Sequence, residues 1–176
     1  EAGDVEQAIG DFSKASELQP AASEYLVQRG LAHLRAEDFA QATADFSRAI
    51  QLAPLRAEYY FHRAQARIGK RETESAVEDY SQAIALGPAP AEYYVQRAQA
   101  CETLGRLEQA IADYSEALRQ RPHVAEWHRR RGVAHAKRED YVQAVEDLQI
   151  AVSLGSEHDP ELYRQLAAAQ AQRLDY

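Results

Sequence analysis

The stretch EYYFHRAQARIGKRETESAVEDYSQAIALGP, residues 58–88, returns 34 residues later as EYYVQRAQACETLGRLEQAIADYSEALRQRP, residues 92–122. Across a longer part of the chain, proline recurs with the same spacing at Pro20, Pro54, Pro88 and Pro122. A fixed period of 34 residues in a helical pattern is typical of solenoids built from repeated helix-turn-helix units. We therefore predict an all-α array whose apolar core lies between neighbouring units.

Small and large residues recur at fixed places in the repeated unit, numbered here so that the proline is position 32. Positions 20 and 27 are alanine in every copy, and position 8 is Gly30, Ala64, Ala98 and Gly132. Position 24 is Phe12, Phe46, Tyr80, Tyr114 and Leu148. Facing small and large side chains let paired helices pack closely.

Proline and acidic residues mark where the helices begin and end. Asp159 before Pro160 predicts an N-cap for the last helix, which fits the register only after a one-residue insertion within 155–160. We expect ten helices, near residues 4–18, 22–36, 38–52, 56–70, 72–86, 90–104, 106–120, 124–138, 140–154 and 160–174.

These landmarks, with a large residue at position 17 in three repeats (Phe39, Leu107, Tyr141), resemble the tetratricopeptide repeat over essentially the whole chain. The resemblance implies a right-handed superhelical solenoid of antiparallel helix pairs, in which the first helix of each pair lines a concave groove. It also implies a scaffold that binds peptides or proteins and carries no catalytic residues. The chain then reads as one array over 1–176, with a partial repeat at 1–22, full repeats at 23–56, 57–90, 91–124 and 125–158, and a further first helix or cap at 159–176.

One departure from the family pattern is systematic. Position 7, often leucine in the family, is arginine on every full first helix, and position 23 is aspartate on every second helix. Because an unpaired buried charge is costly, we expect the two sets to form a ladder of structural ion pairs. The ladder comprises Arg29, Arg63, Arg97 and Arg131 with Asp11, Asp45, Asp79, Asp113 and Asp147.

The groove is the predicted binding site, because in the family positions 2, 5, 9, 12 and 13 face the concave side. Its first two sets are apolar with a glutamate edge, and Phe61 is the largest expected anchor. The later sets are more polar, and together they would suit a segment with apolar anchors and some basic residues. The predicted groove residues are Glu24, Val27, Leu31, Leu34, Arg35, Glu58, Phe61, Gln65, Ile68, Glu92, Val95, Gln99, Glu102, Glu126, Arg129, Val133 and Lys137.

Charge excludes some ligands. Glutamate at position 2 of every full repeat would repel a carboxylate, so clamping of a chaperone C-terminal tail is disfavoured. The net charge is −8, and the only basic cluster, Arg129-Arg130-Arg131, reads as a solvated helix face. A nucleic-acid binder needs a basic face, so we expect no nucleic-acid partner.

Catalytic and metal sites are not predicted. The histidines lack the i, i+4 spacing of a helical metal site, the single Cys101 has packing neighbours, and no glycine-rich phosphate loop is present. We therefore expect no cofactor and no enzyme activity. No apolar run approaches the ~18 residues of a membrane span, so we expect no membrane insertion.

The leading hypothesis is a non-catalytic scaffold that holds a peptide segment or partner protein in its groove. The alternative is a structural spacer or self-association module, stacking end to end through its half repeats, or the non-catalytic arm of a larger multidomain protein. The chain opens inside a repeat and lacks methionine, which indicates a piece of a longer protein. We expect a cytoplasmic location, with any targeting signals outside this piece.

Overall fold

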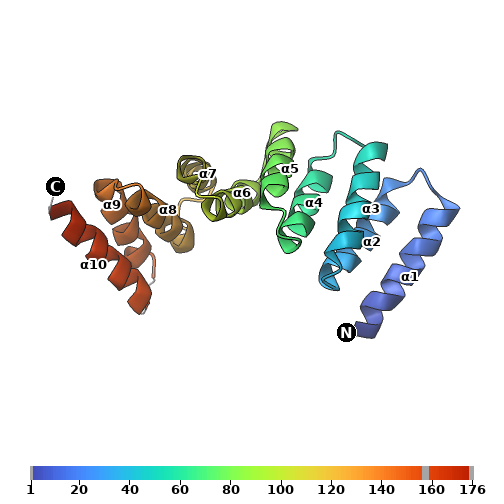
Figure 1. Cartoon of the computed structure of the whole chain (residues 1–176), viewed down its shortest axis with the longest axis horizontal. Helices are drawn as coiled ribbons and strands as arrows, with labels where there is room; N and C mark the ends of the chain where they lie inside the picture. The colour runs from blue at the N-terminus through green and yellow to red at the C-terminus, as the bar shows by residue number, and fades with distance from the viewer. Residues whose placement is uncertain (1, 156–158, 175–176) are drawn as a thin grey trace. The chain divides into compact units, whose positions relative to one another are not determined.

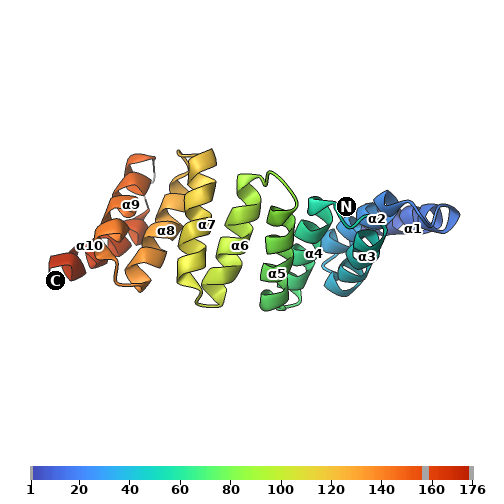
Figure 2. The same cartoon turned by 90° about the horizontal axis from the view of Figure 1, so that it is seen from above.

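The computed structural model describes residues 2–155 and 159–174, which form ten α-helices and no strand. The chain divides into two compact units, Glu1–Ala89 and Pro90–Tyr176. Within each unit every helix packs against its neighbours in sequence, as Figure 1 and Figure 2 show. The prediction of an all-α fold of paired helices is confirmed.

The first unit holds five helices and the second unit the other five. Every predicted helix is present, with its ends within two residues of the predicted ones. The insertion inferred from the register falls partly on residues 156–158, which lie outside the described part of the chain. The helices are α1 (Ala2–Leu18), α2 (Ser23–Arg35), α3 (Phe39–Leu52), α4 (Ala57–Gly69) and α5 (Thr73–Ala85), then α6 (Ala91–Thr103), α7 (Leu107–Gln120), α8 (Ala125–Lys137), α9 (Tyr141–Ser153) and α10 (Pro160–Leu174).

The turns inside the full repeats share one backbone conformation. Position 15 has a positive φ each time, at Glu37, Arg71, Gly105 and Glu139. Only one of the four is glycine, the residue that adopts this conformation without strain. The predicted cap of α10 is confirmed, because Asp159 Oδ1 accepts hydrogen bonds from the backbone N–H groups of Glu161 and Leu162, at 3.0 and 3.3 Å.

Large side chains at position 24 fill the core between paired helices. Phe46, Tyr80, Tyr114 and Leu148 are all fully buried, as is the alanine at position 20 of each full repeat. Opposite them lie the small residues of position 8. A Cβ added at Gly30 would lie 2.9 Å from the Phe46 ring, so this helix pair leaves no room for even a methyl group.

Arginine and aspartate join the two helices of each full repeat. Arg29 Nε donates to Asp45 Oδ2 at 2.8 Å, and Arg63 makes the same bond to Asp79. In the second unit, Arg97 and Arg131 pair in the same way with the aspartate sixteen residues later, at 2.8 and 2.7 Å. These aspartate side chains are only 4–6% exposed, so each buried carboxylate lies against a guanidinium.

The ladder contains a serine that the sequence analysis missed. Arg29 Nη1 also donates to Ser13 Oγ at 3.2 Å, and the serine at position 25 of the preceding repeat plays the same part for Arg63 and Arg131. Each of these three arginines therefore ties two consecutive second helices to its own first helix. Asp11, also predicted in the ladder, is instead exposed.

Candidate functional site

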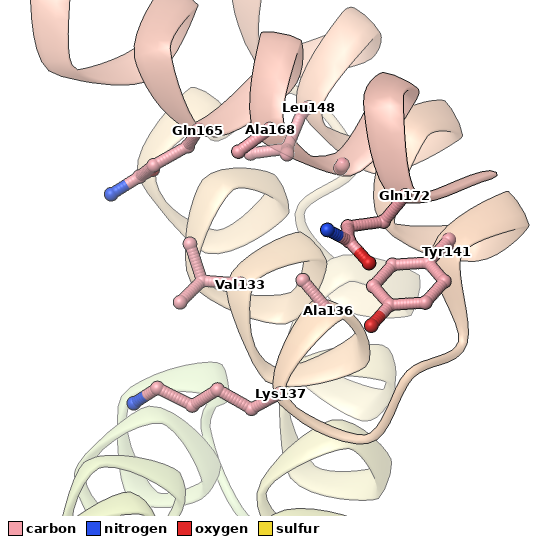
Figure 3. A pocket seen from close by; sticks show the side chains of 9 residues that line it. Val133, Ala136, Lys137, Tyr141, Leu148, Gln165, Ala168 and Gln172 are labelled. Carbon is pink, nitrogen blue, oxygen red and sulfur yellow. The ribbon is translucent and has the colours of Figure 1, made fainter. Parts of the chain in front are cut away.

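Two adjacent hollows lie on the first-helix surface of the second unit, which is formed by α6, α8 and α10. The apolar one is a cavity of about 250 Å³ between α8, α9 and α10. Figure 3 shows its lining, with side chains from α10 facing those of α8 and α9. The lining residues are Val133, Ala136, Lys137, Tyr141, Leu148, Gln165, Ala168, Ala169 and Gln172.

The walls of this apolar cavity are almost entirely carbon. Val133 and Ala136 come from α8, where position 9 and position 12 face the next first helix, and Leu148 forms part of the inner wall from α9. Gln165 Nε2 donates to Glu161 at 2.9 Å, while its Oε1 is buried with no hydrogen-bond partner in the described part of the chain. The cavity therefore favours an apolar group, and one wall carries an unmet acceptor.

The second hollow, which we call the charged hollow, is lined by Glu102, Thr103, Arg129, Arg130, Val133 and Lys137. It adjoins the apolar cavity, because Val133 and Lys137 line both. Together the two hollows make a continuous site that combines a carbon-lined recess with charged groups.

Most charges in the charged hollow already have partners. Arg130 donates to Glu126 at 2.7 Å and to Glu102 at 3.1 Å, and Arg129 donates to Glu126 at 2.7 Å. Although burial opposes its charge, these arginines hold the pKa of Glu126 below its usual value. Lys137 is exposed and has no ion-pair partner among the residues described.

Tyr114 lies beneath the charged hollow and fixes Glu102. Its hydroxyl donates to Glu102 Oε2 at 2.9 Å, and its ring is fully buried. Burial, together with the neighbouring Glu102 carboxylate, raises the pKa of Tyr114 above its ordinary value, so the hydroxyl stays a donor. The floor of the hollow is therefore a rigid Tyr114–Glu102–Arg130 network.

The predicted groove residues have different fates in the structure. Four of those in the second unit, Glu102, Arg129, Val133 and Lys137, come together around the charged hollow, whereas Glu92, Gln99 and Glu126 lie outside its lining. In the first unit Glu24, Arg35, Glu58 and Ile68 are exposed, while Leu31, Leu34 and Gln65 are half-buried.

Three of the four residues at position 5 are buried and do not face the groove, whereas the fourth, Arg129, lines the charged hollow. Phe61, Val27 and Val95 are 7%, 8% and 3% exposed, so they are core side chains and cannot anchor a ligand. Phe61 packs against the rings of His62 and Tyr80, each 5.6 Å away between ring centres. In these three repeats position 5 therefore points between the helices, and the prediction of Phe61 as the main anchor is corrected.

Sequence reasoning missed the α10 side of the cavity. Ala168 and Gln172 occupy positions 9 and 13 of α10 once the one-residue insertion is allowed, so the signal was available. Leu148 gave a second signal, since it is the only aliphatic residue at position 24. Among the described residues no cluster of metal-ligating side chains is present.

Comparison with known proteins decides the family. The tetratricopeptide repeat matches the chain four times, over residues 1–57, 27–90, 61–123 and 95–159. The chain belongs to the tetratricopeptide repeat family. Repeats of this family bind other proteins and are typically non-catalytic. No helix in the described part is both long and apolar enough to cross a membrane.

Solved structures with the same fold include MamA and YrrB. A crystal structure of MamA matches with a TM-score of 0.83 at 21% identity, over 88% of this chain and 91% of that chain. YrrB, a tetratricopeptide repeat protein with an unusual peptide-binding site, gives 0.81 and 21%, over 96% and 84%. MamA from Desulfovibrio magneticus RS-1 gives 0.80 and 20%, over 89% of each chain. No curated protein matches the sequence. At these identities the likeness concerns the fold.

Proposed function

We propose that this protein is a non-catalytic scaffold that holds a peptide segment of a partner on the α6–α8–α10 surface of its second unit. The observation that carries the proposal is the carbon-lined cavity of about 250 Å³ joined to the charged hollow. Ligand sites are mostly apolar recesses with a few polar groups that fix orientation. Support also comes from the family, whose members bind proteins, and from the peptide-binding site of YrrB.

A random 12-residue peptide library displayed on phage tests this function. Peptides are selected on the wild-type chain and then measured against Ala168→Phe, which puts a ring into the cavity from its exposed rim. The matched control is Ala171→Phe on the same helix, where the exposed alanine does not line the cavity. We expect selected peptides to lose at least tenfold in affinity with Ala168→Phe and to keep it with Ala171→Phe. Clones that bind both variants equally, or no clones above background, would reject the proposed site.

A further inference from the structure

The apolar cavity lies beside a position at which the other repeats have a ring. In the first unit Phe46 fills position 24 and stacks on His62 of the next first helix, with ring centres 5.6 Å apart. In the second unit Leu148 replaces that ring, and Gln165 takes the place of the histidine once the one-residue insertion is allowed. An aliphatic side chain and an amide thus replace two stacked rings, and the cavity lies beside both.

Part of the surroundings is the same in both units, whereas Val133 and Ala136 of the cavity wall stand where the first unit has Leu31 and Leu34. Phe46 lies against Gly30 and belongs to the same core cluster as Ala66, and Leu148 lies against Gly132 and clusters with Ala169. The cavity is about 250 Å³, and a closed apolar cavity of about 150 Å³ already binds benzene. An aromatic or large aliphatic side chain supplied by a partner therefore fits here.

The charged residues at the edge of the cavity determine which charge a ligand should carry beside its apolar group. Arg129 and Arg130 are held by Glu126 and Glu102, so they offer little to a ligand. Of the cations that line the two hollows, Lys137 is the one without an acidic partner among the described residues, and it lines both. Figure 3 shows it among the residues of the apolar cavity. A carboxylate next to the apolar side chain would give Lys137 its missing partner.

We propose that the cavity takes a large apolar side chain, preferably a ring, from a partner segment that also carries an acidic side chain beside it, next to Lys137. This inference rests on the proposed function and deepens it. It also reverses the sequence-based expectation of a basic ligand, because Glu102 and Glu126 already pair with Arg130 and Arg129, which leaves Lys137 as the available charge of the lining.

Three small peptides test this inference on the full chain with isotope-labelled methyl groups. The probes are N-acetyl-Phe-Asp-amide, N-acetyl-Phe-Lys-amide and N-acetyl-Ala-Asp-amide, titrated at low salt and followed by NMR at the methyl groups of Val133, Ala136 and Ala168. Burial of a ring predicts that the Phe-Asp probe binds at least about tenfold more tightly than Ala-Asp. An exposed ion pair predicts about a two- to fivefold preference for Phe-Asp over Phe-Lys.

Two variants assign these preferences to residues. Lys137→Glu should invert the preference between the two Phe probes, whereas Lys14→Glu, an equal charge change on an exposed helix of the first unit, should leave it intact. Equal binding of both Phe probes, or a preference for Phe-Lys, overturns the acidic partner. Absence of methyl shifts with any probe overturns the ring site. A positive titration beside a failed peptide selection would reject the proposed function alone.

Discussion

The space between α2, α3 and α4 in the first unit and the space between α8, α9 and α10 in the second are built on the same repeat positions. The first is filled, because Phe46 stacks on His62 and the ring of Phe39 reaches Gly69. The second is hollow, because Leu148 stands at the position of Phe46 and a cavity of about 250 Å³ remains. The small residues and ion pairs build the scaffold in both units. The second unit has smaller side chains around this space, with Val133, Ala136 and Leu148 where the first unit has Leu31, Leu34 and Phe46.

The largest effect should come from the ion pairs, which test whether the scaffold is common to both units. Arg29→Ala in the first unit and Arg97→Ala in the second each leave a buried aspartate without its cation. We expect each to lower the free energy of unfolding by about 3–5 kcal/mol, measured by urea denaturation. Arg63→Ala should cost less, because Arg67 still holds Asp79 at 2.8 Å. A loss at Arg97 much smaller than at Arg29 would show that the units do not share one scaffold.

Gly69→Ala tests whether the space between α2, α3 and α4 of the first unit is filled by side chains. A Cβ at this position would collide with the ring of Phe39, so the ring or the helix would have to shift. Overpacking of this kind predicts a loss of about 1–3 kcal/mol. Gly10→Ala is the control, since a Cβ there meets nothing within 4 Å. A Gly69→Ala protein as stable as the control would mean that the space is not closed.

Exchanging the residues at position 24 should change the stability of the protein differently in the two units. Phe46→Leu removes a fully buried ring and its stacking on His62, so we expect a loss of about 1–2 kcal/mol. Leu148→Phe adds a ring where a cavity already exists, so stability should change by less than about 1 kcal/mol. Thermal unfolding of both variants beside the wild type gives the answer. Equal losses in both variants would contradict a cavity that is ready to receive a ring.

The reactivity of Cys101 tests whether the interior of the second unit is closed to solvent. Its contribution to stability should be the smallest of the four effects. The thiol is fully buried, and burial, with Asp113 nearby, raises its pKa to about 11. The pKa of this thiol is higher in the folded protein than in the unfolded chain. The thiol therefore contributes stability below about pH 8.5, and this contribution is lost as the pH rises through about 11. Alkylation by iodoacetamide at pH 8 should be at least tenfold slower in the folded protein than in urea. Rapid alkylation of the native protein would show an open interior.

The fold could be predicted from the sequence because the repeat states each constraint several times. Several features recur from repeat to repeat: the alanines of positions 20 and 27, the proline at 32 and the arginine–aspartate spacing of sixteen residues. Each pattern can therefore be checked against its other copies. The predicted helix ends lie within two residues of the observed ones, and the ion pairs join position 7 to position 23 as predicted.

The site could be predicted only in part, because it depends on where individual side chains point. Phe61 sits at a position that faces a groove in the family, yet it packs inward against Tyr80. The cavity lies beside Leu148, which stands where the other repeats have a ring, and its size also depends on Val133, Ala136 and how α10 approaches α8 and α9. A hollow is a matter of packed volume, which a linear pattern does not state.

The most direct test of the account is the affinity of a selected peptide for Leu148→Phe, measured by isothermal titration calorimetry beside the wild type. The account predicts that the added ring fills the cavity, that stability is kept, and that affinity falls at least tenfold. A folded Leu148→Phe protein that binds the peptide as tightly as the wild type would contradict the claim that the cavity beside Leu148 is the binding site.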